Sequence, residues 1–142
     1  MKLVDANLLL YAVDTTAPRH KRARAWLESE LSGSDTMGFA WIALLGFLRL
    51  STSPRVFRSP LAPEDAFDMI ASWLSRPNAT VLHPTGRHAT LLRELLVPLG
   101  TAGNLTTDAH LAALSLEHGA ELCSSDADFV RFPGVRWRDP LA

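Results

Sequence analysis

Three aspartates closely follow short apolar runs, where a strand would deliver a side chain to a site. Asp5 follows "KLV" at the start of the chain, and Asp126 and Asp128 follow "AELCS" within "CSSDADF". Carboxylates gathered at one place repel each other, and their pKa values rise unless a cation offsets the charge. Oxygen ligands of this kind suit Mg²⁺ or Mn²⁺, which also bind phosphates and activate water. The pattern therefore predicts metal-dependent chemistry at phosphorus.

A fourth aspartate, Asp108, lies within the helical segment 105–119. It shares the apolar face of that segment, because Leu111 and Ala112 occupy its i+3 and i+4 positions. The polar face carries His110, Glu117 and His118, and the two histidines are expected at the surface. No basic residue lies within one helical turn on the face of Asp108, so burying this carboxylate is costly. Asp108 is therefore a further candidate ligand.

Each acid alone also has an ordinary structural interpretation. Asp5 suits a helix N-cap, Asp126 an Asx-turn and Asp108 a buried ion pair. A shared metal pocket explains all of them together, since they fall at predicted strand ends and on one apolar helix face. For Asp5 the two interpretations are compatible, because a capping carboxylate at a strand end can also face a cleft.

Short strands alternate with helices along the chain. Strands are predicted at residues 2–4, 36–40, 79–84, 120–124 and 135–137, and helices at residues 7–13, 20–32, 41–51, 64–74, 87–99 and 105–119. This alternation predicts a single α/β domain over residues 1–142, a three-layer α/β/α arrangement with a central, mostly parallel sheet. Ligand sites in such sheets lie beyond the carboxyl ends of the strands, where Asp5 and Asp126 are placed.

The composition is that of a globular domain without a strong overall charge. The 142 residues include 14 Lys plus Arg and 15 Asp plus Glu, a net charge of −1, so binding of nucleic acid requires a local basic patch. Candidates are Arg19, Lys21, Arg22, Arg24, Arg55 and Arg58, although a solvated helix face explains them equally well. The single cysteine, Cys123, excludes an internal disulfide and a zinc site built on several cysteines. No membrane segment is found, and a cytoplasmic location is expected.

Two stretches resemble a known family. "KLVDANLLLYA" is similar to the opening of PIN-domain proteins, and "GNLTTDAHLAALSLEHGAELCSSDADFVRFPGVRW" to their closing half, more narrowly to VapC-type toxins of bacterial toxin–antitoxin pairs. The resemblance implies an Mg²⁺- or Mn²⁺-dependent ribonuclease that acts on RNA, pairs as a homodimer and is neutralised by a VapB-type antitoxin. It also implies that Asp5, Asp108 and Asp126 are catalytic metal ligands, with Asp128 as a further metal ligand at the margin.

The chain departs from this family at the second acid. The family usually has a glutamate early in the helix after the second strand, and the matching place here is Gly46. No acid stands between Asp35 and Glu64, which leaves open whether one metal is bound or two. An alternative is therefore a catalytically inactive PIN module that binds RNA or protein.

A phosphotransferase with an aspartate nucleophile is a further alternative. That chemistry would call for a catalytic lysine, and Lys2 and Lys21 are the only lysines. Two other polar residues also have two interpretations each. Arg49, in an otherwise apolar helix, neutralises the acids, contacts an RNA phosphate or forms a plain structural ion pair, and Asn104 either orients the pocket or forms a turn.

Overall fold

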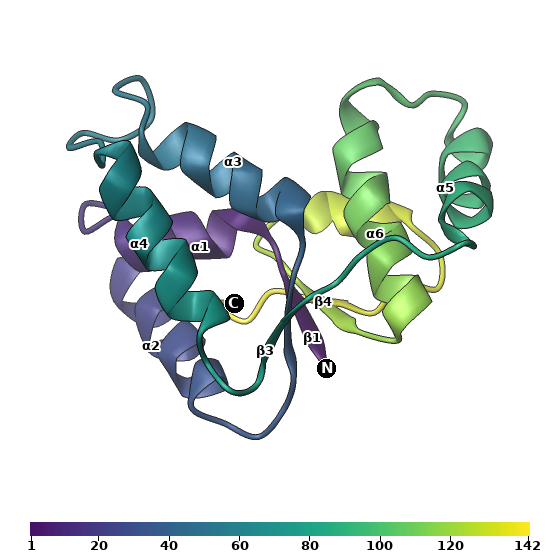
Figure 1. Cartoon of the computed structure of the whole chain (residues 1–142). Helices are drawn as coiled ribbons and strands as arrows, with labels where there is room; N and C mark the ends of the chain where they lie inside the picture. The colour runs from purple at the N-terminus through teal and green to yellow at the C-terminus, as the bar shows by residue number, and fades with distance from the viewer.

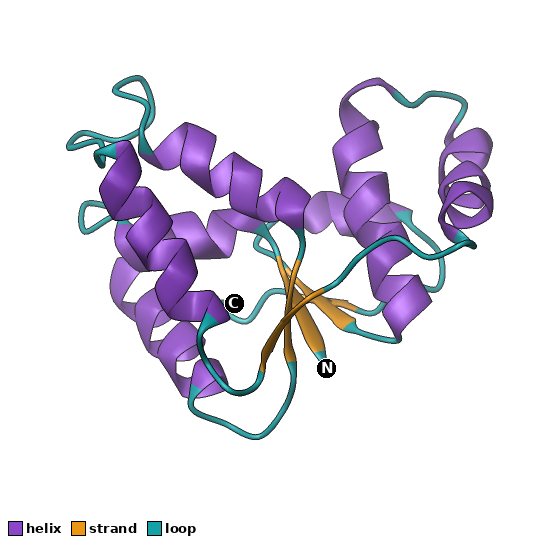
Figure 2. Cartoon of the chain, viewed as in Figure 1, coloured by secondary structure: helices purple, strands orange, loops and turns teal.

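The sheet at the centre of the molecule is built from five parallel strands. A computed structural model describes residues 1–142, which is the whole sequence. The strands are β1 (Lys2–Val4), β2 (Met37–Phe39), β3 (Ala79–Val81), β4 (Glu121–Cys123) and β5 (Trp137–Arg138), in the spatial order β3-β2-β1-β4-β5. Every neighbouring pair is parallel, so the predicted sheet is confirmed, and β1 lies at its middle (Figure 2).

Six helices cover the two faces of this sheet. They are α1 (Ala6–Val13), α2 (His20–Leu31), α3 (Trp41–Ser51), α4 (Pro63–Leu74), α5 (His88–Leu96) and α6 (Thr106–His118). Helices α1 to α4 gather on one side of the strands, and α5 and α6 lie on the other side (Figure 1). The predicted three-layer arrangement is therefore confirmed. None of the helices combines the length and the apolar character needed to cross a membrane.

Neighbouring residues of β1 belong to two separate hydrophobic clusters. Val4 packs with buried residues of α1 to α4, and Leu3 packs with buried residues of α5 and α6. This alternation follows from strand geometry, in which successive side chains point to opposite faces. Both side chains are fully buried, so the chain leaves β1 at the junction of the two helical layers.

Three predicted segments differ from the structure by two or more residues at one end, and the others agree to within one residue. The predicted helix 87–99 ends early, because α5 stops at Leu96 and a 3-10 turn, Val97–Leu99, follows around Pro98. Proline has no backbone N–H and disrupts the hydrogen-bond ladder of an α-helix. Strand β3 ends at Val81 and not at Pro84, and the last strand is shifted from 135–137 to Trp137–Arg138.

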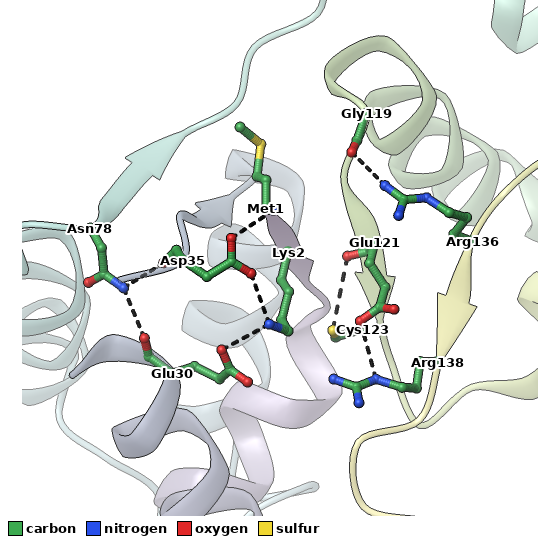
Figure 3. Close-up of polar contacts among 10 residues, drawn as sticks. All are labelled: Met1, Lys2, Glu30, Asp35, Asn78, Gly119, Glu121, Cys123, Arg136 and Arg138. Atoms are coloured by element: carbon green, nitrogen blue, oxygen red, sulfur yellow. Dashed lines mark hydrogen bonds and ion pairs between the residues drawn. The ribbon is translucent and has the colours of Figure 1, made fainter. Parts of the chain in front are cut away.

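The charged groups at the amino end of the sheet are paired with one another (Figure 3). The terminal amino group of Met1 lies 2.9 Å from Asp35, and Lys2 Nζ lies 2.9 Å from Asp35 and 3.1 Å from Glu30. The Asn78 amide donates to the carbonyl oxygens of Glu30 and Asp35 at 2.9 and 2.8 Å. This end of the sheet is therefore electrostatically satisfied by residues of the chain itself.

Candidate metal centre

Asp5 ends β1 and begins α1. Its Oδ1 accepts a hydrogen bond from the backbone N–H of Ala6 at 2.7 Å, so Asp5 is the N-cap of α1. Its Oδ2 accepts a hydrogen bond from the Ser124 hydroxyl at 2.8 Å, and the Asn7 amide nitrogen lies at 3.4 Å. Burial raises the pKa of Asp5 even though the hydrogen bonds act in the opposite direction. The capping role is therefore present, and the carboxylate also lines a cavity at the carboxyl end of the sheet.

Ser124 joins the ends of β1 and β4. Its hydroxyl donates to Asp5, accepts from the backbone N–H of Asp126 at 3.0 Å and accepts from the Asn7 amide at 3.0 Å. The Trp137 indole N–H donates to the Ser124 carbonyl at 3.0 Å, which fixes the backbone there. Asn7 and Ser124 are site residues that sequence reasoning missed. The available signal was their position, two residues after Asp5 and directly after β4.

Three carboxylates come together at the start of α6. Asp108, Asp126 and Asp128 offer ligand atoms that all lie within 4.8 Å of one another. Asp108 is in the first turn of α6, whereas Asp126 and Asp128 belong to the turn after β4, where Asp126 accepts from the Asp128 N–H at 2.9 Å. Asp5 lies outside this group of three, although its charge acts on Asp108. Asp128, expected at the margin, is thus one of the three grouped acids.

The negative charge of these acids is not compensated within the chain. Burial, and then the charges of Asp126, Asp5 and Asp128, raise the pKa of Asp108 to about 6. No basic side chain forms an ion pair with Asp5, Asp108 or Asp126. Asp128 alone approaches a cation, Arg131 at 3.8 Å, and both of these side chains are exposed. The carboxyl end of the sheet therefore differs from the amino end, where every charge has a partner.

The donor set fits a divalent cation such as Mg²⁺ or Mn²⁺. All candidate ligands are carboxylate oxygens, which these ions prefer. Asp108, Asp126 and Asp128 offer oxygens close enough together for one ion to be shared after side-chain adjustment. Ligation by Asp5, Asp108, Asp126 and Asp128 stays a prediction.

A cavity of about 510 Å³ lies beside Asp5, where residues of α1, α3 and α6 meet. Gly46 and Arg49 contribute to its wall from α3, and Thr107 contributes from α6. Gly46, which occupies the family's glutamate position, therefore faces the same cavity as Asp5. A Cβ atom added to Gly46 would lie 3.4 Å from the Cβ of Ala6, an ordinary van der Waals contact. The position has room for a side chain, but none is present.

Arg49 and Asn104 are placed differently with respect to this cavity. Arg49 lines it and forms neither an ion pair nor a side-chain hydrogen bond, so the ion-pair interpretation of Arg49 is wrong. Asn104 is exposed in the 3-10 turn Gly103–Leu105 and has no side-chain hydrogen bond, so it occupies a turn. Of the basic residues considered as a patch for nucleic acid, Arg19 is paired with Asp139 at 3.4 Å.

No lysine approaches the acids. Lys2 is paired with Glu30 and Asp35 at the amino end of the sheet, and Lys21 is exposed on α2. A phosphotransferase with a catalytic lysine is therefore not supported by the structure.

His110 is half-buried, so its predicted place at the surface is wrong. Its Nδ1 lies 2.9 Å from His88 Nε2, and His88 Nδ1 lies 2.6 Å from the carboxylate of Glu117, whose side chain has no exposed surface. Burial lowers the pKa of His110. The helical period placed these residues on a polar face, but α5 packs against that face. The network fastens α5 to α6, the helix that holds Asp108.

A family model for the PIN domain matches residues 2–135. The chain belongs to the PIN-domain family. Among curated proteins, this PIN domain is similar to Ribonuclease VapC37 of Mycobacterium tuberculosis, with 52% identity over 142 residues, 100% of this chain and 99% of the relative. It is also similar to Ribonuclease VapC33 of the same organism, with 48% identity over 141 residues, 99% of each.

Solved structures share the fold of this PIN domain at low sequence identity. VapBC2 from Rickettsia felis, bound to a DNA fragment from its promoter, matches with a TM-score of 0.71 at 18% identity, over 96% of each chain. VapC20 of Mycobacterium tuberculosis, described as a sarcin-ricin loop cleaving toxin, matches with a TM-score of 0.66 at 20% identity, over 96% of this chain and 99% of that one.

Proposed function

We propose that this PIN domain is a toxin endoribonuclease that hydrolyses RNA phosphodiester bonds with Mg²⁺ or Mn²⁺. The observation that carries the proposal is the group Asp108, Asp126 and Asp128, uncompensated by any basic partner except the exposed Arg131. Relatives at 52% and 48% identity over nearly the whole chain are named ribonucleases, which supports RNA as the substrate.

The acids divide into a grouped set and a fixed neighbour. Asp108, Asp126 and Asp128 would hold the cation together with the neighbouring Asp5, and the bound cation would supply charge stabilisation at phosphorus and a more acidic water. Asp5 is held in one orientation by the Ala6 N–H and the Ser124 hydroxyl. Because burial raises its pKa, Asp5 is a stronger base than an exposed aspartate, and it can orient the attacking water and accept its proton.

The proposed partner is a VapB-type antitoxin. Structures similar in fold to this chain are described as VapBC complexes, among them DNA-bound VapBC from Salmonella typhimurium. An antitoxin that silences the centre is expected to place a basic side chain near Asp108 and Asp126, because these carboxylates have no cation of their own. Association would then weaken when either acid is neutralised.

RNA cleavage by purified protein tests the proposal. Wild type is expected to cleave RNA with Mg²⁺ or Mn²⁺ and to stop when EDTA removes the ion. Asp108→Asn is expected to lose at least about a hundredfold in rate, since even residues that only support a metal ligand contribute 10–100-fold. Asp128→Asn is expected to lose less, because Asp128 is exposed and near Arg131.

The matched control is Asp68→Asn, an exposed aspartate of α4 away from the centre, which should cleave at the wild-type rate. Equal background rates for wild type and Asp108→Asn would overturn the nuclease proposal. That result would favour the alternative of an inactive PIN module. This alternative arises because Gly46 stands where the family usually has a glutamate.

A further inference from the structure

We infer that the cavity between α1, α3 and α6 is a nucleotide subsite for single-stranded RNA, in which Arg49 binds a phosphate beside the scissile one and the apolar wall takes a base. The inference rests on the proposed ribonuclease function and names a part of the chain that would bind its substrate. It assigns Arg49 to RNA contact and not to neutralisation of the acids.

The cavity lies next to the acid centre, to which Asp5 and Thr107 link it. Asp5 forms part of its wall, and Thr107, on the same wall, precedes Asp108 in the first turn of α6. A strand of RNA whose scissile phosphate reaches Asp108 would therefore place a neighbouring nucleotide in the cavity. The volume of about 510 Å³ falls within the usual range of small-molecule sites.

Arg49 is the one cationic residue on the cavity wall, and its guanidinium is free of protein partners. The oxygens of Asp5 are engaged by Ala6, Ser124 and Asn7, and none of them contacts Arg49. A guanidinium group has a planar set of donors that matches the geometry of a phosphate. Because Arg49 is not paired with an acid, this capacity remains available to a phosphate from outside the chain.

The remaining residues of the cavity wall can accommodate an RNA nucleobase. Ile42, Leu45, Leu50 and Leu111 supply apolar surface, and Gly46 adds no side chain between them and Ala6. Unstacked bases of single-stranded RNA can be splayed into a protein, whereas the bases of an A-form duplex remain stacked inside the helix. A glutamate at position 46 would fill part of this space and bring a second negative charge close to the phosphate. The glycine therefore keeps the cavity open.

Binding of a short fluorescein-labelled single-stranded RNA in Mg²⁺ tests the role of Arg49 apart from catalysis. The measurement uses the Asp108→Asn protein, which is expected to hold RNA without cutting it. Adding Arg49→Gln should weaken binding about tenfold, as for loss of one charge-assisted hydrogen bond. The slope of log affinity against log salt should fall by about 0.7, the value for one phosphate contact to a single strand. Arg49→Lys should restore the salt slope but only part of the affinity.

Cavity filling tests the base-binding wall. In the otherwise wild-type protein, Gly46→Leu should raise KM for single-stranded RNA several-fold, because it occupies the space that the base would take. The matched control is Arg93→Gln, which removes an exposed arginine of α5 outside the cavity and should change neither affinity nor KM.

The failures of the two proposals are distinguishable. If wild type cleaves RNA but Arg49→Gln changes neither affinity nor salt slope, the subsite is wrong and the nuclease stands. If wild type does not cleave but Arg49→Gln weakens RNA binding, the nuclease is wrong and the subsite stands. If the Asp108→Asn protein binds no RNA, or if duplex RNA binds as tightly as the single strand, the subsite is overturned.

Discussion

Asp108 holds its proton more tightly than a free aspartate, since its pKa is raised from 3.8 to about 6. Between these two values the folded metal-free protein binds more protons than the unfolded chain, so the contribution of Asp108 to stability falls as pH rises. His110, whose pKa is lowered from 6.5 by burial, acts in the opposite direction at pH values below 6.5. The comparison must therefore be made against Asp108→Asn, in which His110 is retained.

We expect the Tm of Asp108→Asn to rise relative to wild type between pH 5 and pH 7 when both are measured in EDTA. Scanning calorimetry of the two proteins at several pH values measures this difference. Excess Mg²⁺ or Mn²⁺ at pH 7 should raise the Tm of wild type and close the gap, because bound cations offset the repulsion. A Tm difference that stays constant with pH would show that Asp108 titrates as an ordinary aspartate.

Gly46→Glu should tighten metal binding, since it adds a carboxylate to the wall that Asp5 already lines. The Cβ atom fits, and replacing glycine within α3 adds roughly 1 kcal/mol of helix propensity. We expect lower Kd values for Mn²⁺ by calorimetry and a higher KM for RNA. Gly46→Ala, which adds the Cβ without the charge, separates the two effects. An unchanged Kd for Mn²⁺ would show that a side chain at position 46 of α3 does not reach the ion.

A site residue could be predicted from the sequence where its side chain is unusual for the segment that surrounds it. Asp5 and Asp108 could be selected because carboxylates on apolar segments require an explanation. Asn7 and Ser124 could not, because polar residues beside a strand end are ordinary and their hydrogen bonds join parts of the chain far apart in sequence. The partners of His110 were hidden for the same reason, since they come from another helix.

At the junction of β1 and α1, the side chain of Asp5 has both a structural and a proposed catalytic role. Asp5 caps α1 and also faces the proposed centre. Asp5→Asn should keep the cap and the free energy of unfolding, because asparagine caps helices about as well as aspartate. Asp5→Ala should lower that free energy by about 2 kcal/mol, since the Ala6 N–H loses its cap and the Ser124 hydroxyl loses its acceptor.

Both Asp5 variants should lose cleavage, and denaturant unfolding alongside the RNA assay measures the two effects. Wild-type cleavage by Asp5→Asn would reduce Asp5 to a structural cap. A stable Asp5→Ala protein would instead show that the capping hydrogen bond contributes little to the fold.

At the level of elements, helices were predicted more accurately than strands. The helix 105–119 matches α6 closely because Gly119 adopts φ 63°, the left-handed conformation that ends helices. The strands have only two or three residues each, so their ends are set by pairing with neighbours and not by a long local pattern. The nearness of Asp5 and Asp126 was predictable from topology, because parallel strands end on one side, whereas the approach of Asp108 depends on how α6 packs and could not be read from strand order.

The folded molecule exposes less apolar surface than the apolar sequences of its helices suggest. Leu44 and Phe47 are buried in the core of the single chain, whereas Trp41 and Leu45 remain 45% and 54% exposed on α3. We expect a homodimer, as the family resemblance implies, with Trp41 in the interface. Light scattering at micromolar concentration should give twice the mass of 15.6 kDa, and Trp41→Ser should weaken the association.

Phe67→Ser is the matched control, because Phe67 is an exposed aromatic residue of α4 on a different helix. It should leave the mass unchanged. A wild-type protein that stays monomeric across the concentration range would contradict the dimer.

The position of β1 has a consequence for how the protein is made. β1 precedes the other strands in the sequence, yet it lies at the middle of the sheet, and its neighbour β4 follows only after β2 and β3. Until β4 has emerged from the ribosome, one side of β1 has no partner strand, and Asp126 does not yet exist. Pairing between such distant segments is slow and late in folding. A chain that stops before β4 would therefore leave one edge of β1 open and would lack Asp126 and Asp128, two of the three grouped acids.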